Sequence, residues 1–246
     1  MALIVKSDDW DSVNIKNIEK LLTVAMNMMD NHYNSKVTKD IIITNNPEIK
    51  TPLFYYDRGV NGEYMINITA KDSYFCQYLY QFFHEYCHLR MNCNPLTGKK
   101  AKWFDESIAE LASFFGMLQL SKIWNSKFTE FPLCNYNNNN VLDEYINKEI
   151  QSKNFSLEDN LSFKEWLKQN INELELNQYI REKNGIIANK LLSEFTKNKI
   201  LWELLTYWNT WDIDVNDDIF LTMKKWKKKV PQKNKKYIEK IEKMLF

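Results

Sequence analysis

Residues 75–92 of the chain read FCQYLYQFFHEYCHLRMN. Their apolar side chains recur every three or four residues, at Phe75, Leu79, Phe82, Phe83, Tyr86 and Leu89. Residues spaced in this way share one face of a helix, so the stretch predicts an amphipathic helix. Asp72 or Ser73 can cap its start. We expect the helix to end near Asn92–Pro95.

Two of the chain's three histidines lie in the middle of this helix, in the pattern His84-Glu85-Tyr86-Cys87-His88. Residues four apart face the same side of a helix, so both imidazoles can reach one metal ion. Glu85 lies about 100° around the helix axis. Its carboxylate can therefore approach a water held by the metal without becoming a ligand itself. This arrangement predicts a metal site that activates water.

The chain before this helix predicts one further helix and three short strands. Residues 14–31 carry apolar side chains at helical spacing. The three expected strands are separated by turns that contain Asn-Pro or Gly, and they are Ile41–Thr44, Leu53–Tyr56 and Glu63–Thr69. The helix with the two histidines therefore follows directly after a strand.

Beyond residue 92 the pattern becomes almost entirely helical. A turn at Thr97-Gly98 leads into a helix from Trp103 to Trp124, and residues 125–140, which end in four asparagines, predict an exposed loop. The helices expected after this loop cover residues 141–151, 162–173, 186–195 and 199–209, followed by two helical segments in the tail. Ser162 and Glu165 form a capping box at the start of the second of these.

Zinc in a hydrolytic site usually has three protein ligands and an open position for water, so a third ligand is required. Residues 103–110 read WFDESIAE. The motif HExxH, followed by a helix that opens with W-x-(N/D)-E-x-x-A, resembles the gluzincins, the zinc metallopeptidases typified by thermolysin and aminopeptidase N. The resemblance implies that Glu106 is the third ligand and that Glu110 orients one ligand histidine. These two glutamates are four residues apart and so face the same way.

Two features depart from the gluzincin pattern. The gap between His88 and Glu106 is 17 residues, one short of the aminopeptidase spacing, which is a difference that a loop can absorb. Arg90 stands where zincins usually have a hydrophobic residue. The resemblance is strict over residues 84–113. It also implies that Glu63–Thr69 is an edge strand along the cleft, ready to pair with a peptide backbone.

The fold class implied by the resemblance is α+β, of the zincin-like metallopeptidase type. A small mixed sheet has the active-site helix behind it, and a mainly helical C-terminal lobe closes the cleft. The expected parts are a zincin-like catalytic core at residues 1–124, an Asn-rich loop at 125–140, and the helical lobe with its Lys-rich tail at 141–246.

Peptide-bond hydrolysis is the activity that the resemblance implies, with a peptide or protein as substrate. One Zn²⁺ ion held by His84, His88 and Glu106 would polarise the scissile carbonyl, and Glu85 would act as general base. The alternative is a catalytically silent zincin-like module that keeps the metal for binding or regulation. An intact Glu85 favours the enzyme, because a silent module has no chemical need of this carboxylate.

The oxyanion formed during hydrolysis normally has a second donor besides the metal. No histidine follows His88, so the donor of the thermolysin-like enzymes is missing. Aminopeptidase N-like enzymes use a tyrosine just before a Lys-Gly that opens the next helix, and the closest segment here is YIREKNG at residues 179–185, with one residue inserted between Lys and Gly. Tyr179 and Arg181 are therefore the two candidate donors, with Tyr207 third.

The composition of the 246 residues is that of an ordinary soluble globular protein, with 44% hydrophobic and 26% charged residues. A net charge of +1 gives no overall attraction to nucleic acid. No apolar run is long enough for a membrane span, and the N-terminus does not read as a secretory signal. Four cysteines without a CxxC pair indicate reduced thiols, and the expected location is cytoplasmic.

The tail holds eight lysines between residues 224 and 236. We interpret this run as a solvated helix end and linker, and contact with nucleic acid or an anionic membrane is the alternative.

Overall fold

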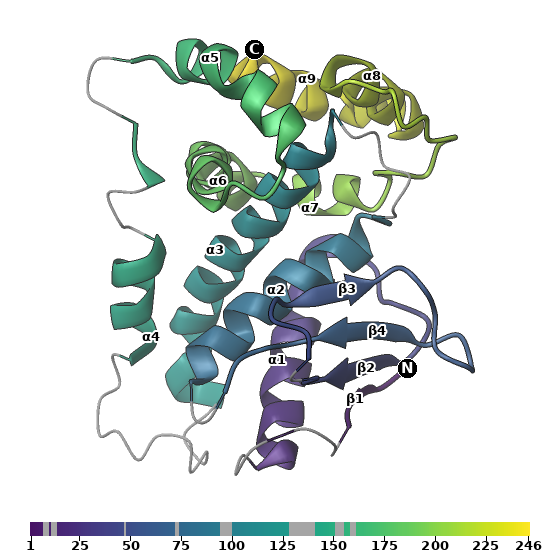
Figure 1. The fold of residues 1–246 in the computed structure, drawn as a ribbon, viewed down its shortest axis with the longest axis vertical. Coiled ribbons are helices and arrows are strands. Elements are labelled where there is room, and N and C mark those ends of the chain that lie inside the picture. The colour runs from purple at the N-terminus through teal and green to yellow at the C-terminus, as the bar shows by residue number, and fades with distance from the viewer. Residues whose placement is uncertain are drawn as a thin grey trace.

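The structure is a computed structural model that describes residues 1–6, 10, 14–46, 48–71, 74–93, 100–127, 141–150, 155–157 and 161–246. A small sheet lies on one side of the molecule, and helices make up the rest (Figure 1). This mixed α+β architecture, with a largely helical second half, confirms the predicted fold class at that level.

The sheet has four strands in the order β1-β2-β4-β3. Strands β1 (Leu3–Val5), β2 (Ile41–Thr44) and β4 (Tyr64–Asn67) run parallel, whereas β3 (Leu53–Tyr55) is antiparallel to β4. The prediction that Glu63–Thr69 forms the edge strand is therefore wrong. Strand β4 pairs on both sides, so its backbone groups are already used, and β3 is the edge strand on that side.

Strands β3 and β4 are antiparallel neighbours because the chain turns back between them, over residues 56–63. The turn between β3 and β4 contains Gly62 at φ +83°, a conformation that a residue without Cβ adopts without strain. The amide of Gly59 donates to the carbonyl of Glu63 (2.9 Å), which closes the turn. Strand β1, which the sequence analysis did not predict, pairs with β2 through only three residues.

Helix α1 (Ile15–Tyr33) covers the sheet and packs against helix α2 (Phe75–Arg90). The Asn14 side chain caps α1, and Asn34 ends it in the left-handed region at φ 54°. Helix α2 ends at Arg90, two residues before the expected end near Asn92–Pro95. The expected caps Asp72 and Ser73, and the turn at Thr97-Gly98, lie outside the described residues.

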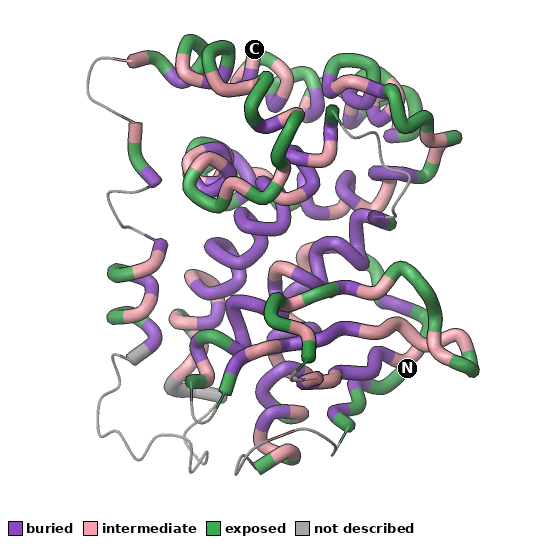
Figure 2. The backbone as a smooth tube through the Cα atoms, viewed as in Figure 1, coloured by how far each residue is buried: buried purple, intermediate pink, exposed green. Residues whose placement is uncertain are grey.

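Helix α3 (Lys102–Lys127) is the central helix of the molecule and packs against α2 on one side and α6 (Arg181–Lys197) on another. Both α2 and α3 are almost wholly buried (Figure 2). They approach so closely that a Cβ on Gly116 would lie 2.6 Å from the ring of Phe83. Helix α3 continues to Lys127, so residues 125–127 do not belong to the expected loop, and residues 128–140 lie outside the described part.

The remaining helices follow the predicted order with shifted ends. They are α4 (Val141–Tyr145), the π-helix η1 (Ile146–Ile150), α5 (Phe163–Leu176), α7 (Ile200–Leu205), α8 (Ile219–Lys229), the 3₁₀ turn η3 (Gln232–Asn234) and α9 (Lys235–Leu245). The capping box of Ser162 and Glu165 is confirmed. Helix α6 begins at Arg181 instead of residue 186, which brings Arg181 into its first turn.

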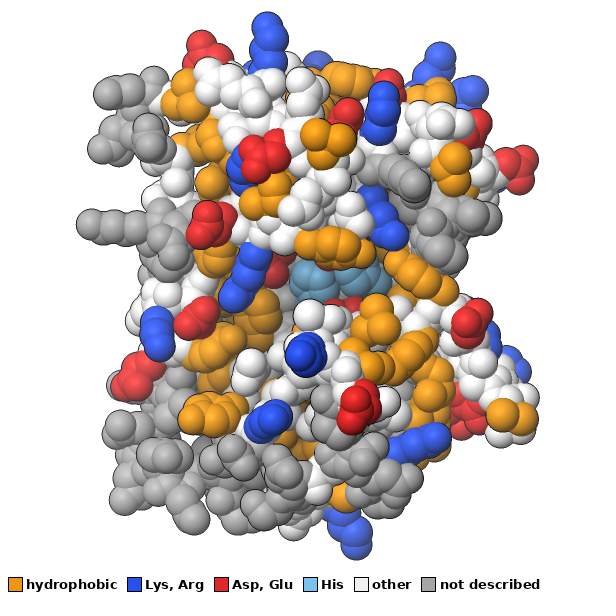
Figure 3. All heavy atoms as spheres, in the orientation of Figure 1, with side chains coloured by type: hydrophobic (Ala, Val, Ile, Leu, Met, Phe, Trp, Pro, Cys, Tyr) orange, Lys and Arg blue, Asp and Glu red, His pale blue; other side chains and the backbone are white. Residues whose placement is uncertain are grey.

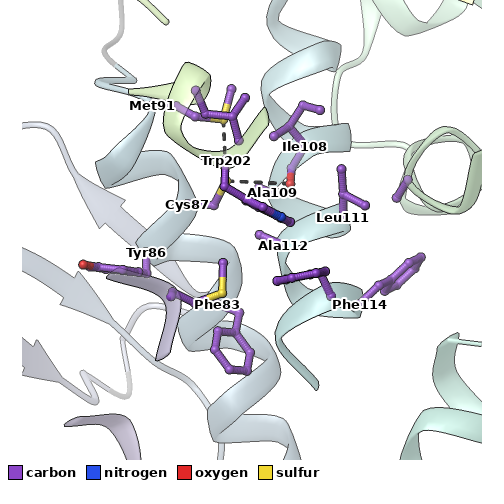
Figure 4. Packing of buried hydrophobic residues seen from close by; sticks show 14 of the residues in the cluster. Phe83, Tyr86, Cys87, Met91, Ile108, Ala109, Leu111, Ala112, Phe114 and Trp202 are labelled. Carbon is purple, nitrogen blue, oxygen red and sulfur yellow. Dashed lines mark hydrogen bonds between the residues drawn. The ribbon is translucent and has the colours of Figure 1, made fainter. Parts of the chain in front are cut away.

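The core is continuous from the sheet into the helical half. Figure 4 shows Phe83 and Cys87 of α2 facing Ile108 and Ala109 of α3, with Trp202 of α7 close by. Trp202 and Trp208 are both fully buried, so the helical half shares its core with the helices that carry the HExxH and Glu106 motifs. In the described ranges, no helix is both long enough and apolar enough to cross a membrane.

Candidate metal centre

Helices α2 and α3 bring the side chains of His84, His88 and Glu106 together. One ligand atom from each of the three lies within 4.8 Å of the others. The distance from Oε2 of Glu106 is 3.3 Å to Nε2 of His84 and 3.6 Å to Nε2 of His88. The three predicted ligands therefore share one small volume.

These distances fit a zinc ion. Bonds of about 2.0–2.1 Å arranged as a tetrahedron place neighbouring ligand atoms about 3.3–3.4 Å apart. Two nitrogens and one carboxylate oxygen are also a donor set that zinc accepts in catalytic sites. The residues present consequently fit the metal that the motif implies.

Glu110 lies beside His84 on the side away from the cluster. Its Oε2 is 3.5 Å from Nδ1 of His84, while the hydroxyl of Tyr80 donates to Oε1. Nε of Arg181 is 3.6 Å from the same Oε1. Because Nδ1 of His84 faces Glu110, its Nε2 points into the cluster, which is the arrangement that fixes a ligand histidine.

Helical spacing accounts for this grouping. Tyr80, His84 and His88 follow one another at intervals of four on α2, and Glu106 and Glu110 do the same on α3. The sequence analysis did not identify Tyr80. Its position, four residues before His84, was a signal that could have found it.

Electrostatic coupling within the cluster is strong. Burial would raise the pKa of Glu106, but the adjacent His88 and His84 hold it well below its usual range. Burial alone would lower the pKa of His84, yet the hydrogen-bonding carboxylates of Glu106 and Glu110 raise it well above its ordinary value. Glu106 is thus ionised, as a carboxylate ligand must be.

Glu85 is 4% exposed, and its side chain lines the cleft beside the histidines. Burial raises its pKa, whereas His84, His88 and a hydrogen bond to the backbone of Phe54 act in the opposite direction. Phe54 belongs to the edge strand β3, so the carboxylate lies between that strand and the ligand cluster.

The ligand cluster opens into a cleft with a volume of about 1380 Å³. Histidine surface is visible in Figure 3 at the bottom of a hollow in the middle of this face, bordered by hydrophobic and charged side chains. Its lining includes Leu53 and Phe54 of β3, Arg181 at the start of α6, and Tyr179 just before that helix.

The two leading candidate oxyanion donors both line the cleft. Tyr179 is 64% exposed, and Arg181 lies with its guanidinium over the ring of Tyr80 while facing Glu110 and Glu149. Tyr207 does not line the cleft and packs against the core. Tyr56, which the sequence analysis did not single out, lines the cleft after β3, and burial together with Cys93 and Tyr179 raises its pKa.

The opposite face of α2 explains the unusual Arg90. This arginine is buried, and its Nη1 lies 2.6 Å from Oδ1 of Asp30 on α1 and 3.1 Å from the carbonyl oxygen of Ser35. The hydroxyl of Tyr86 donates to the same Asp30 oxygen. A hydrophobic residue is not needed at position 90, because Asp30 neutralises the guanidinium.

Asp105 is a second buried carboxylate that the sequence analysis did not identify. Nε1 of Trp208 donates to its Oδ1 (2.7 Å), and Sγ of Cys93 donates to Oδ2 (3.4 Å). Burial raises the pKa of Asp105 to about 6. Its partners are distant in sequence, so no local pattern indicated the arrangement.

The described cysteines are buried, and none of Cys76, Cys87 and Cys93 is in a disulfide with another described residue. Burial raises the pKa of Cys87 to about 12. Cys87 and Cys93 contact Ile108 and Asp105, respectively, as expected for packing residues that are not ligands. Cys134 lies outside the described residues.

Comparison of the chain with protein-family models, with curated proteins and with solved structures gives no match. The function is therefore inferred from the residues and their geometry.

Proposed function

We propose that this protein is a zinc-dependent metallopeptidase of the gluzincin type, with a zincin-like catalytic fold. The observation that carries the proposal is the convergence of His84, His88 and Glu106, with Glu85 beside them in one cleft. A zinc-binding cluster and an independent carboxylate on the same cleft wall are what hydrolysis by an activated water requires.

Each residue has a separate role in this proposal. His84, His88 and Glu106 hold one Zn²⁺ ion, which when bound polarises a carbonyl and acidifies water. The carboxylate of Glu85 accepts the proton of the attacking water and passes it to the leaving nitrogen.

Glu110 is the positioning residue of the site. It accepts from the hydroxyl of Tyr80 and lies 3.5 Å from Nδ1 of His84, so it fixes the orientation and tautomer of that imidazole. Tyr179 is the proposed oxyanion donor. Its exposed hydroxyl-bearing side chain lines the cleft, whereas the guanidinium of Arg181 is already close to two carboxylates.

The proposed substrate is a peptide or protein, and the proposed location is the cytoplasm. Buried thiols outside any described disulfide support a reducing compartment. The edge strand β3 also supports a peptide substrate, because a free strand edge beside the cleft offers backbone groups to an extended chain.

The test combines metal analysis with digestion of a mixed peptide library. We expect one zinc per chain, cleavage that a chelator abolishes, and a loss of turnover of roughly 10³-fold in Glu85→Gln with zinc still bound. Glu144→Gln is the matched control, because Glu144 is an exposed carboxylate on the same cleft and should retain activity. Full activity of zinc-replete Glu85→Gln would refute the mechanism, and stoichiometric zinc without any cleavage would favour a silent binding module.

A further inference from the structure

The cleft is much longer than the ligand cluster and extends away from it in one direction. Its floor follows α2 from Tyr74 to His88. At 1.5 Å per residue these positions span about 21 Å along the helix. The ligands lie at the C-terminal end of this floor, so about 10–15 Å of it continues beyond His84 towards the start of α2.

Helix α3 runs antiparallel to α2 and forms the side of this extension. Oε2 of Glu106 lies 3.6 Å from Nε2 of His88, and further along α3 the hydroxyl of Ser113 donates to the carbonyl of Tyr80 (2.9 Å). Higher numbers on α3 therefore meet lower numbers on α2. Trp124, which also lines the cleft, consequently lies near the start of α2.

Helix α4 completes the far end of the cleft. Its Leu142 and Tyr145 line the same cavity, and the rings of Tyr145 and Tyr80 lie 6.0 Å apart. Phe75 adds a further half-buried ring from α2. We call the group formed by Phe75, Trp124, Leu142 and Tyr145 the far apolar subsite.

The size and chemistry of this extension indicate its occupant. The cleft volume of about 1380 Å³ exceeds the roughly 300–1,000 Å³ of sites for small molecules. An extended peptide advances about 3.3 Å per residue, so a distance of about 10–15 Å corresponds to three or four residues. Aromatic surface at that distance suits a large apolar side chain of a peptide already bound at the ligand cluster.

We propose that the far apolar subsite binds an aromatic or large aliphatic side chain three or four residues from the scissile bond, on one side of it. The inference rests on the proposed peptidase function and adds its substrate class. The substrate is an extended polypeptide that continues three or four residues beyond the scissile bond, not a dipeptide, because a short ligand at the cluster does not reach this surface.

The experiment uses the zinc-loaded enzyme and a series of ten-residue peptides with one cleavable bond. A single Phe is moved through the four positions on each side of that bond, and Gly occupies the other test positions. We expect Phe at the third or fourth position on one side to raise kcat/KM about tenfold or more over Gly, the range that burial of a large apolar side chain gives.

Variants connect this preference to the subsite. Tyr145→Ala and Trp124→Ala should abolish the preference for Phe, whereas Tyr145→Phe, which keeps the ring, should retain it. The control is Phe220→Ala, which removes a ring that is 53% exposed and packs at a tilt against Phe246, outside the cleft lining. Circular dichroism checks folding, and if Tyr145→Ala does not fold, the peptide series on the unaltered enzyme still decides.

A second readout is independent of turnover. Fluorescence anisotropy measures the Kd of the same peptides, carrying a terminal fluorophore, for the zinc-loaded Glu85→Gln variant. We expect Kd to follow the position of Phe in the same way. If wild-type protein cleaves the peptides without any dependence on these positions, the subsite inference fails and the peptidase function stands. If nothing is cleaved but Kd depends on Phe at one distant position, the peptidase function fails and the subsite stands. A Kd without positional dependence overturns the subsite.

Discussion

Helix α2 has two polar faces that differ in how their charges are satisfied. On the face towards α3, His84 and His88 converge with Glu106, and their ligand atoms fall within 4.8 Å of one another. On the opposite face, Arg90 pairs with Asp30, which also accepts from Tyr86. The first face brings three groups that could bind a metal together in a cleft. On the second face, the opposite charges pair with each other inside the protein.

This difference distinguishes a face that can bind a metal ion from a face that stabilises the fold. A buried ion pair contributes little net stability over apolar packing, but loss of one partner leaves a buried, uncompensated charge. The pair between Arg90 and Asp30 ties α2 to α1 on the side away from the cleft. We call the face of α2 that carries His84 and His88 the front face, and the face that carries Arg90 the back face. We therefore expect substitutions on the back face to change stability and substitutions on the front face to change zinc binding.

The largest expected effect that tests this comparison comes from Arg90→Met. The variant leaves Asp30 buried without its cation, and we expect the free energy of unfolding to fall by about 3–5 kcal/mol. Urea denaturation measures the change. The double variant Asp30→Leu with Arg90→Met removes both charges and should recover most of the loss. Zinc stoichiometry of the folded single variant should stay at one, and loss of zinc with unchanged stability would contradict the assignment of this face.

The same variant has a predicted pH dependence in metal-free protein. Burial raises the pKa of Asp30 above 3.8 in the folded state, whereas Tyr86 and Arg90 lower it. A carboxyl group with a raised folded-state pKa stabilises the fold when protonated, and this contribution is lost as pH rises through that pKa. Without Arg90 the pKa rises further, so the stability deficit should be largest at neutral pH and shrink towards acid. A deficit independent of pH would show that Asp30 is not its source.

Whether the contacts on each face could be predicted depends on how far apart the interacting residues are in the sequence. His84, Glu85 and His88 could be assigned because one helix turn relates them, and Glu106 because a second motif resembles a known family. Asp30 and Arg90 are 60 residues apart, and no local pattern connects them. The prediction of the edge strand was wrong for a similar reason, because the position of β4 between β2 and β3 depends on pairing between segments that are separate in the sequence. Strand β1 has three residues, too few to show a periodicity.

On the front face, we expect Glu110→Gln to weaken zinc binding by about 10–100-fold, because the carboxylate that faces Nδ1 of His84 is replaced by a neutral amide. Competition with a chromogenic zinc chelator measures the affinity. Glu144→Gln, an exposed carboxylate on the same cleft, is the control and should leave the affinity unchanged. The free energy of unfolding of metal-free Glu110→Gln should change less than that of Arg90→Met. Equal zinc affinity in wild type and Glu110→Gln would remove Glu110 from the positioning role.

The smallest expected effects come from a matched pair of tyrosines on the two faces of α2. The hydroxyl groups of Tyr80 and Tyr86 each donate a hydrogen bond to a buried carboxylate. The acceptor is Glu110 on the front face and Asp30 on the back face. Replacing either with Phe keeps the ring and removes the hydrogen bond to the carboxylate, and a hydrogen bond to a charged group contributes about 1.5–3 kcal/mol. In Tyr86→Phe, Nη1 of Arg90 also loses the hydroxyl oxygen as an acceptor (3.3 Å). In Tyr86→Phe we expect this loss as lower stability in denaturant, with zinc affinity unchanged. In Tyr80→Phe we expect a several-fold weaker zinc affinity in the chelator assay, because Glu110 loses the donor that fixes its position beside His84. Similar zinc affinities in both variants would show that the Tyr80 hydroxyl does not contribute more to zinc binding than the Tyr86 hydroxyl.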